Sequence, residues 1–490
     1  MGEIPSWSVM TETIVIQKYD EVYIKLRADA GTLHEISDHF TFNVPGAKFS
    51  PAYRNKVWDG KIRLLNVMTG LIYAGLIPYI ENFAKEREYD IEFDGDFANV
   101  EFSLKEAKDF SLTLGLPYEV RDYQLDAFTH AVRSNRALLL SPTASGKSLI
   151  IYLIARYFNL RTLLIVPTVS LVHQMASDFR DYGHTDDCHK ITAGVSKDTG
   201  EQITISTWQS IYKMPKAWFD QFDMVIGDEA HLFKAKSLTS IMGKMTNCKY
   251  RFGFTGTLDG TQTNKLVLEG VFGAVRRVTT TAELIEQKHL ADFEIKCIVL
   301  SYPDEIRKDI IKKTYQEEID FIVRNEARNK FIKNLALSLK GNTLILFQYV
   351  EKHGDVLYDM IKTAAGDRHI YYVSGRTEAD DREFIRKIVE TEKDAIIVAS
   401  SGVFSTGVNI RNLYNVIFSS PSKSRIKNLQ SIGRVLRKSE IKESAVLYDI
   451  ADDLSWKSKP NYTIEHFKER IKIYSEESFP FKIYKVSLKT

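Results

Sequence analysis

The chain has 490 residues, of which 44% are hydrophobic and 27% are charged, and its net charge at pH 7 is only +2. This composition is typical of a globular protein of about three domains, and the small net charge means that any polyanion must be bound by local basic patches. The sequence has no long apolar run, no signal-peptide pattern and only three widely spaced cysteines, which predicts a cytosolic protein with reduced, buried thiols.

Residues 1–100 are predicted to form a small α+β domain, with strands at Thr13–Gln17 and Glu21–Arg27 and a helix at Gly31–His39. The pair Asp59-Gly60 is a signal for a tight β-hairpin. Basic and aromatic residues surround this pair: Lys48, Tyr53, Arg54, Lys56, Trp58, Lys61 and Arg63. Such a hairpin in an otherwise acidic domain suits phosphate contact and base stacking, whereas the alternative is a solvated hairpin whose Trp58 belongs to the core.

The next segment, residues 93–117, has little periodicity and is predicted to be a linker. Beyond it, apolar strands alternate with helical patterns, and polar residues follow each strand. The predicted strands are 137–140, 162–166, 202–206, 223–227 and 250–254. This alternation predicts a parallel, doubly wound sheet, which binds its ligands at the carboxyl ends of its strands.

The first of these strands runs into Ser-Pro-Thr-Ala-Ser-Gly-Lys-Ser, residues 141–148, and then into a helical pattern. A loop of this kind exposes backbone N–H groups at the start of a helix, which suits a polyphosphate. Lys147 would reach the outer phosphates, and the Ser148 hydroxyl would hold Mg²⁺. The P-loop pattern begins with glycine, and Ser141 takes that place here, so an ordinary strand-to-helix turn is the alternative.

Asp228 and Glu229 leave another predicted strand of the same sheet. Nucleotide hydrolysis needs one carboxylate in the Mg²⁺ shell and a second acceptor that orients and deprotonates water. Because adjacent residues leaving a strand point to opposite sides, Asp228 is assigned to the metal and Glu229 to the attacking water.

A second α/β pattern begins near residue 290 and contains no P-loop. Its elements are a long charged helical stretch, 304–339, and strands at 342–347, 369–373, 395–399 and 415–418. Arg434 and Arg437 follow, three residues apart on one helical face, where they would stabilise charge on the transferring phosphoryl group. A solvent-exposed basic helix is the alternative. The basic tail from Trp456 is predicted to hold a helix at 464–474 and a strand at 481–486, packed on the second unit or in contact with nucleic acid.

Over roughly residues 118–450 the motifs resemble, in order, those of superfamily-two helicases and translocases. The resemblance implies an α/β fold of two RecA-like doubly wound parallel-sheet domains after the small α+β domain, with ATP and Mg²⁺ as cofactors. The expected domains are 1–100, 101–290 and 291–455, followed by a basic helical extension, 456–490.

The resemblance also implies a role for each matching residue. The expected catalytic residues are Lys147, Asp228, Glu229, Arg434 and Arg437, and the metal ligands are Ser148 and Asp228. The expected nucleotide-binding residues are Arg121, Gln124, Ser141, Pro142, Thr143, Ala144, Ser145, Gly146, Lys147, Ser148 and Gly407. Expected DNA contacts are Pro167, Thr168, Thr207, Gln209, Ser374, Gly375 and Ser400, to which the basic hairpin adds Lys56, Trp58, Lys61 and Arg63. The residues expected to couple the nucleotide site to the DNA contacts are His231, Thr255, Thr257 and Gln430.

A finer resemblance, which includes the small domain before the motor, is to the recombination and fork-remodelling helicases of T-even phages. It implies a monomeric 3′→5′ motor in the host cytoplasm that acts on branched DNA, single-stranded DNA and RNA–DNA hybrids. The implied reactions are fork regression, branch migration and R-loop unwinding. A double-stranded DNA translocase without strand separation, an RNA helicase and a non-catalytic binding module are the alternatives, and the intact ATP motifs argue against the last.

Overall fold

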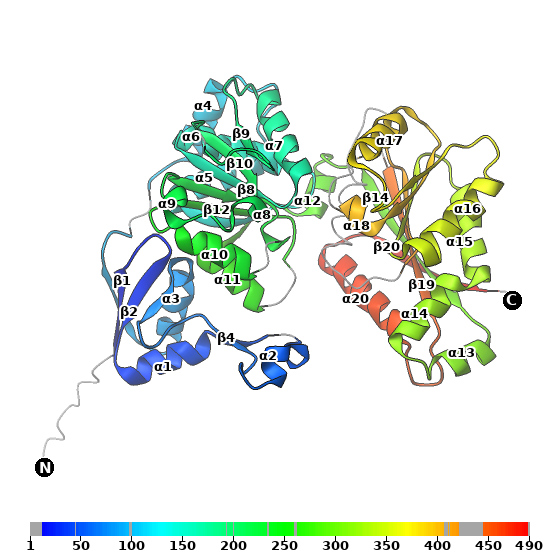
Figure 1. The fold of residues 1–490 in the computed structure, drawn as a ribbon, viewed down its shortest axis with the longest axis horizontal. Coiled ribbons are helices and arrows are strands. Elements are labelled where there is room, and N and C mark those ends of the chain that lie inside the picture. Colours follow the sequence, from blue (N-terminus) through cyan, green and yellow to red (C-terminus); the bar gives the residue numbers. More distant parts are fainter. Residues whose placement is uncertain are drawn as a thin grey trace, which may run out of the picture. The chain divides into compact units, whose positions relative to one another are not determined.

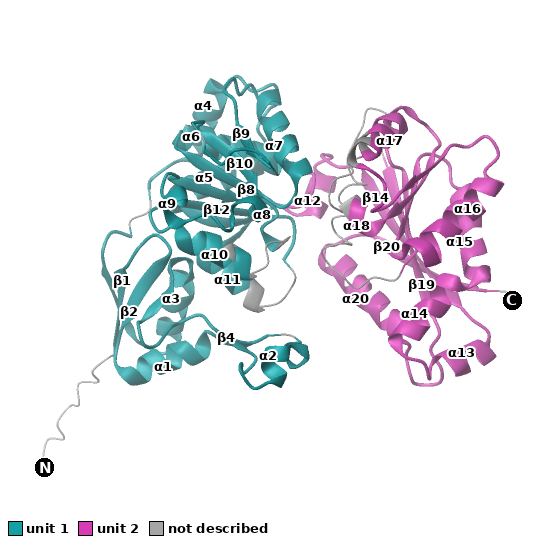
Figure 2. Ribbon diagram, viewed as in Figure 1, with its two compact units in different colours: residues 1–141, 146–278 teal, residues 142–145, 279–490 magenta. Residues whose placement is uncertain are grey.

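Figure 1 shows the computed structural model, which describes residues 12–44, 46–97, 100–192, 194–198, 200–232, 235–258, 262–405, 410, 412–420 and 444–488. The chain divides into two compact units, residues 1–141 with 146–278 and residues 142–145 with 279–490 (Figure 2). The first unit holds a four-stranded sheet, a two-stranded sheet and a seven-stranded sheet, and the second unit holds another seven-stranded sheet.

The four-stranded sheet near the N-terminus has the order β5 (Leu71–Tyr73), β2 (Tyr23–Arg27), β1 (Thr13–Lys18) and β6 (Asp90–Asp94). Every second residue of β1 and β2 is buried, as expected for a sheet with one covered face. The covering helices are α1 (Ala30–His39) and α3 (Ile77–Glu86), which contribute Ile36, Ile80 and Phe83 to the shared core. The predicted α+β character, both strands and the first helix are confirmed.

The predicted tight hairpin at Asp59-Gly60 is wrong. The strand after it, β4 (Lys61–Arg63), pairs antiparallel with β3 (Thr41–Asn43). The long connection between these two strands contains η1 (Ala47–Phe49) and α2 (Pro51–Arg54). Gly60 has φ 79°, and a Cβ atom there would lie 3.0 Å from the Tyr53 ring. Gly60 therefore allows the chain to bend beneath the Tyr53 ring, and it is not part of a two-residue turn. We call residues 44–63 the basic loop.

The seven-stranded sheet of the first unit is parallel throughout. Its order is β13 (Val275–Arg277), β7 (Arg136–Leu140), β12 (Tyr250–Thr255), β11 (Met224–Gly227), β8 (Thr162–Val166), β10 (Ile203–Thr207) and β9 (His189–Ile191). Leu139 and Leu164 belong to a core shared with α5 (Asp122–Ser134), α6 (Lys147–Phe158) and α7 (Val169–Asp181). Their neighbours Leu138 and Leu163 belong to a second core, shared with α8 (Trp208–Ile211), α9 (Lys216–Phe219), α10 (Ala235–Lys244) and α11 (Gln262–Phe272). Both faces of the sheet are thus covered, which confirms the predicted doubly wound architecture.

The predicted linker is also wrong in part, because residues 93–117 contain α4 (Leu104–Thr113). A capping box between Ser103 and Glu106 starts this helix. The preceding Phe102 lies in the core against Phe128, and the helix itself buries only Ala107 and Ser111 and packs Phe110 against the same core. A helix with so narrow a buried face gives only a weak apolar period, which explains why the pattern indicated no structure.

The N-terminal sheet and the first large sheet share part of one core. Leu266 and Val267 of α11 pack among the N-terminal core residues. Tyr79 of α3 donates a hydrogen bond to Glu269 Oε2 at 2.7 Å, and Arg136 Nη2 donates to the Glu21 carbonyl at 3.0 Å. The N-terminal sheet is therefore fixed to the first large sheet as one compact unit.

The second unit contains the other parallel sheet, preceded by α12 (Thr281–Glu286). Its order is β16 (Ile370–Val373), β17 (Ile396–Ser400), β15 (Thr343–Phe347), β18 (Asn415–Phe418), β19 (Ser444–Asp453), β14 (Asp292–Ser301) and β20 (Phe481–Ser487). The predicted long helix is three helices, α13 (Asp304–Ile310), α14 (Tyr315–Arg324) and α15 (Glu326–Ser338), and the sheet also carries α16 (Asp355–Ala364), α17 (Ala379–Thr391) and α18 (Ser401–Ser405). The breaks fall at Thr314 and Asn325, whose side chains cap the helices that follow.

The C-terminal residues are built into this second unit. Strand β20 extends the sheet along β14, and α20 (Tyr462–Glu476) packs on it. Glu318 accepts hydrogen bonds from the backbone N–H groups of Tyr462 and Thr463, so a carboxylate lies at the positive end of α20. Arg470 is bound to the buried Asp449 at 2.8 Å. The predicted tail helix and strand are confirmed.

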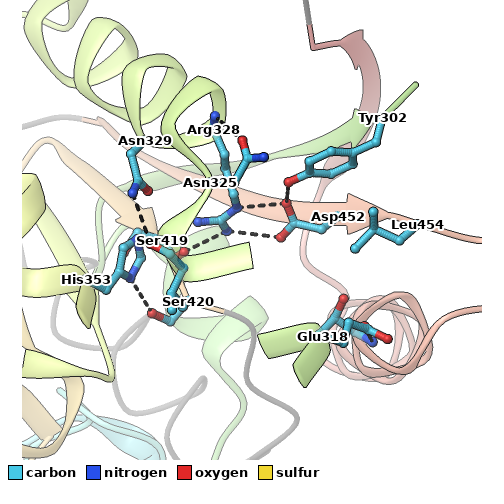
Figure 3. A network of polar contacts seen from close by, with 12 residues as sticks. Tyr302, Glu318, Asn325, Arg328, Asn329, His353, Ser419, Ser420, Asp452 and Leu454 are labelled. Atoms are coloured by element: carbon cyan, nitrogen blue, oxygen red, sulfur yellow. Dashed lines mark hydrogen bonds and ion pairs between the residues drawn. The ribbon is translucent and has the colours of Figure 1, made fainter. Parts of the chain in front are cut away.

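A buried ionic network ties four elements of the second unit together (Figure 3). The Arg328 guanidinium on α15 donates to both carboxylate oxygens of Asp452 on β19, at 2.7 and 3.0 Å, and to the Ser419 carbonyl at 2.8 Å. The Tyr302 hydroxyl after β14 donates to the same carboxylate at 2.7 Å. Both charged side chains are fully buried. Removing one partner would therefore leave an uncompensated charge in the interior.

Replacing Arg328 with methionine should lower the free energy of unfolding of the second unit by about 3–5 kcal/mol, because Asp452 would stay buried without its cation. Urea unfolding followed by tryptophan fluorescence measures this loss. The double variant Arg328→Met/Asp452→Leu should be more stable than Arg328→Met alone. Lys330→Met, on the exposed face of the same helix, is the control that should change nothing measurable. Equal stability of Arg328→Met and the native protein would contradict the assignment.

The three cysteines are free; Cys248 and Cys297 are buried and Cys188 is half-buried. Within the described ranges, no helix combines the length and the apolar character needed to cross a membrane.

Candidate functional site

The predicted P-loop connects β7 to α6. Gly146 caps the helix in a left-handed conformation with φ 79°, and Ala144 also has a positive φ of 67°. Ser141 has no positive φ, and its N–H donates to the Thr255 carbonyl at 2.8 Å as a continuation of the β7–β12 ladder. The position that is glycine in the P-loop pattern therefore accepts a side chain here without strain.

Arg121 and Gln124, two of the expected nucleotide-binding residues, lie beside this loop. The buried Gln124 side chain donates to the Gly146 carbonyl at 3.5 Å and accepts the Arg121 backbone N–H at 3.0 Å. A Cβ atom on residue 146 would lie 2.4 Å from Gln124 Nε2, so only glycine allows this contact. Arg121 Nη1 in turn donates to the Tyr123 hydroxyl at 2.7 Å. The structure thus brings Arg121 and Gln124 to the P-loop helix.

Lys147, the first residue of α6, is paired with Glu229. Its Nζ atom lies 3.1 Å from Glu229 Oε1, and His231 Nδ1 lies 3.5 Å from Glu229 Oε2. Glu229 has a left-handed backbone with φ 49°, which is uncommon for a residue other than glycine. The conformation turns the chain sharply after β11 and directs the carboxylate toward the P-loop lysine.

Asp228 is buried at the end of β11. Burial, with a smaller contribution from the Glu229 charge, raises the pKa of this carboxyl to about 7, although Lys147 acts in the opposite direction. A divalent cation would relieve this penalty, and carboxylate and hydroxyl oxygens are ligands that Mg²⁺ prefers. The described residues contain no cluster of three or more His, Cys, Asp or Glu side chains that could hold a metal ion. The Asp228 carboxylate and the Ser148 hydroxyl are the kinds of oxygen donor that suit a Mg²⁺ whose remaining ligands are nucleotide phosphates.

Tyr182 is a member of the site that the sequence motifs did not identify. Its hydroxyl lies 2.9 Å from Ser148 Oγ. The residue follows α7 and lies outside every motif, so no signal in the sequence connects it with the P-loop.

The expected coupling residues form a chain of hydrogen bonds between β11 and β12. Thr255 Oγ1 donates to the Thr257 carbonyl at 2.7 Å and lies 2.6 Å from His231 Nδ1. Because the hydroxyl proton is used on Thr257, His231 Nδ1 is the donor in the second bond. His231 thus connects Glu229, in the nucleotide site, with the end of β12. Gln430 lies outside the described residues.

The expected DNA contacts of the first unit that lie outside the basic loop are at the carboxyl ends of the neighbouring strands β8 and β10: Pro167, Thr168, Thr207 and Gln209. Gln209 Nε2 donates to the Pro167 carbonyl at 3.4 Å. Two of the hydroxyls also have structural roles, since Thr168 caps α7 and Thr207 Oγ1 lies 2.9 Å from Ser210 Oγ.

The expected DNA contacts of the second unit also lie at the carboxyl ends of its strands. Ser374 and Gly375 follow β16, and Ser400 ends the adjacent β17. Ser374 Oγ accepts the Arg376 N–H at 3.3 Å. The remaining predicted residues, Gly407, Arg434 and Arg437, lie outside the described part of the chain.

The basic loop forms an open hollow on the surface of the first unit. It is lined by Lys48, Tyr53, Arg54, Lys56, Val57, Trp58, Asp59 and Arg63. The Trp58 indole is half-exposed, outside the N-terminal core, and donates to the Lys61 carbonyl at 2.8 Å. Arg63 is paired with Asp59 at 2.6 Å. Trp58 is therefore not a core residue, and its ring is held at the surface among cations.

Comparison with known proteins gives consistent matches along the chain. Residues 13–94 match the family described as DNA helicase UvsW, N-terminal, residues 117–260 match the type III restriction enzyme res subunit, and residues 326–439 match the helicase conserved C-terminal domain. The ATP-dependent DNA helicase uvsW of Enterobacteria phage T4 is 36% identical, over 97% of this chain and 100% of its own length. The DNA 3'-5' translocase XPB2 of Sulfurisphaera tokodaii is 24% identical, over 68% of this chain and 81% of its own.

Solved structures agree with these matches. The crystal structure of T4 UvsW is 34% identical, covers 97% of this chain and 100% of its own, and has a TM-score of 0.52. A fragment of a putative HsdR subunit of a type I restriction enzyme from Vibrio vulnificus has a TM-score of 0.57 at 20% identity, over 78% of this chain and 72% of its own, and supports the fold alone. The two seven-stranded parallel sheets are RecA-like domains, as the sequence predicted.

Proposed function

The chain belongs to the family of the phage T4 DNA helicase UvsW, and from that premise we propose that it remodels branched DNA in the 3′→5′ direction. An ATP-dependent helicase activity of the UvsW type follows from the family itself. The proposal adds fork regression, Holliday-junction branch migration and R-loop unwinding, in recombination, repair and replication. The observation that carries it is the cluster of Lys147, Asp228 and Glu229 at one sheet edge, in a unit that also carries the basic loop.

In the proposed reaction, the backbone of residues 141–148 binds the phosphates and the Lys147 ammonium pairs with the outer ones. Asp228 and Ser148 would hold Mg²⁺, which would neutralise phosphate charge. The Glu229 carboxylate, now 3.1 Å from Lys147, exchanges this partner for the attacking water and accepts its proton.

Arg434 and Arg437 are proposed to stabilise the charge on the transferring phosphoryl group, and Gln124 with Arg121 to bind the base. His231 and Thr255 would connect Glu229 with β12, because His231 Nδ1 lies 3.5 Å from Glu229 Oε2 and 2.6 Å from Thr255 Oγ1. Closure of the two RecA-like domains on ATP and their release after hydrolysis would move the protein along DNA.

The DNA is proposed to lie along the carboxyl edges of the sheets, held by Pro167, Thr168, Thr207, Gln209, Ser374, Gly375 and Ser400. The basic loop, with Lys56, Trp58, Lys61 and Arg63, would meet the branch point, because cations bind phosphates and an exposed indole stacks on an unpaired base. The 3′→5′ direction is supported by the relative described as a DNA 3'-5' translocase. We propose that the motor works as a monomer on branched DNA, single-stranded DNA and RNA–DNA hybrids, in the cytoplasm of the host cell.

Replacing Lys56, Trp58 and Lys61 together with alanine should weaken binding to a model replication fork by at least about tenfold. The loss follows from two phosphate contacts and one stacking ring, each ring contact being worth about 1–3 kcal/mol. Fluorescence anisotropy on a fork, a four-way junction, an R-loop and a single strand measures the effect. ATP turnover stimulated by single strands should change much less, because the motor edge is untouched.

The matched control is Lys105→Ala/Lys108→Ala, on the exposed face of α4. It also removes two positive charges from the first unit. Its fork affinity should stay near that of the native protein. If the loop variant binds the fork as tightly as this control does, the basic loop has no role at the branch. Absence of ATPase stimulation by every nucleic acid in the panel would contradict the proposed function as a whole.

A further inference from the structure

The Ser148 hydroxyl, the proposed Mg²⁺ ligand of the P-loop, is already engaged within the protein. Its oxygen lies 2.9 Å from the Tyr182 hydroxyl. Phenol is the stronger acid of the two groups, which favours Tyr182 as the donor and the Ser148 oxygen as the acceptor. A cation that coordinates this oxygen takes one of its two lone pairs and draws electron density from the other, so metal binding opposes the hydrogen bond from Tyr182.

Tyr182 is held in this place from two sides. Its backbone N–H donates to the carbonyls of Asp178 and Phe179, which caps the end of α7. Its ring packs against Tyr152, at 5.5 Å between centroids, and Tyr118 meets it edge-on at 6.3 Å. Tyr152 lies four residues after Ser148 on α6 and so shares its face of the helix. The aromatic contacts therefore fix the phenol against the second residue of the P-loop helix, Ser148.

We propose that Tyr182 is a positioning residue that holds the Ser148 hydroxyl in the nucleotide-free protein and must release it when Mg²⁺ and nucleotide bind. The inference rests on the proposed role of Ser148 as a metal ligand. Its consequence is that part of the binding free energy of the metal is spent on breaking one hydrogen bond.

The test is a titration of the full chain with a fluorescent ADP analogue, with and without Mg²⁺, so that no turnover is needed. The measured quantity is the factor by which Mg²⁺ tightens binding. In Tyr182→Phe, which keeps the ring, this factor should rise about fivefold, the equivalent of one ordinary hydrogen bond. Tyr152→Phe removes a hydroxyl from the same aromatic cluster without touching Ser148, and its factor should match that of the native protein.

Ser148→Ala tests the metal site separately from the role of Tyr182. Without the hydroxyl, most of the tightening of nucleotide binding by Mg²⁺ should be lost. If this variant retains the full effect, Ser148 is not a metal ligand and the proposed metal site fails. If it loses the effect while Tyr182→Phe gives an unchanged or smaller factor, the positioning role of Tyr182 alone is overturned. Circular dichroism of each variant checks that the fold is intact.

Discussion

Replacing Lys147 with alanine should reduce ATP hydrolysis by at least about 100-fold, the loss typical when one charged or hydrogen-bonding group is removed from a transition state. The lysine starts α6 directly after the left-handed Gly146, so its ammonium lies where the outer phosphates would be bound. Its present partner, Glu229 at 3.1 Å, also loses its counter-charge in this variant. Steady-state phosphate release with saturating DNA measures the effect.

Affinity for DNA should change little in the same variant, because Lys147 is largely buried and lies outside the basic loop. Lys147→Arg is the informative control. It keeps the charge but carries a planar guanidinium in place of a compact ammonium, so it should restore the ion pair with Glu229 without restoring turnover. Hydrolysis by Lys147→Ala at the native rate would show that the phosphates are bound elsewhere.

The parts of the fold that the sequence predicted well are those where burial leaves a simple pattern. Strands β7, β8, β11 and β12 are mostly apolar and buried on both sides because helices cover both faces of the sheet, and each stops at a turn. Chemistry at such turns is local, so Lys147, Ser148, Asp228 and Glu229 can be proposed as site residues from their spacing alone. The structure brings Lys147 and Glu229 within 3.1 Å although 82 positions separate them.

The parts that escaped prediction depend on contacts between distant segments. Asp59-Gly60 has the local signature of a hairpin, but β4 pairs with β3 because the chain folds back over the long basic loop. Helix α4 buries so few residues that its period is weak, and only its capping box marks it. Tyr182 and Arg328 belong to no motif, since their partners, Ser148 and Asp452, are set by packing between elements.

Replacing Glu229 with glutamine should separate nucleotide binding from hydrolysis. The amide keeps the size of the side chain but cannot accept a proton from water, so turnover should fall by about 100-fold to 10,000-fold, the usual contribution of a general base. Binding should survive, because the charge of Glu229 is one of the causes that raise the pKa of Asp228. Removing that charge makes the ionised Asp228 easier to form and so favours a bound cation.

Asp228→Asn is the matched comparison, since it changes the adjacent carboxylate in the same way. Asp228→Asn should lose both turnover and the tightening of nucleotide binding by Mg²⁺. Glu229→Gln should lose turnover but keep the tightening by Mg²⁺. Single-turnover hydrolysis and titration with a fluorescent nucleotide, each with and without Mg²⁺, distinguish the two variants. If both behave alike, the two carboxylates share one role, and the division between metal and water that follows from their opposite directions after β11 does not hold.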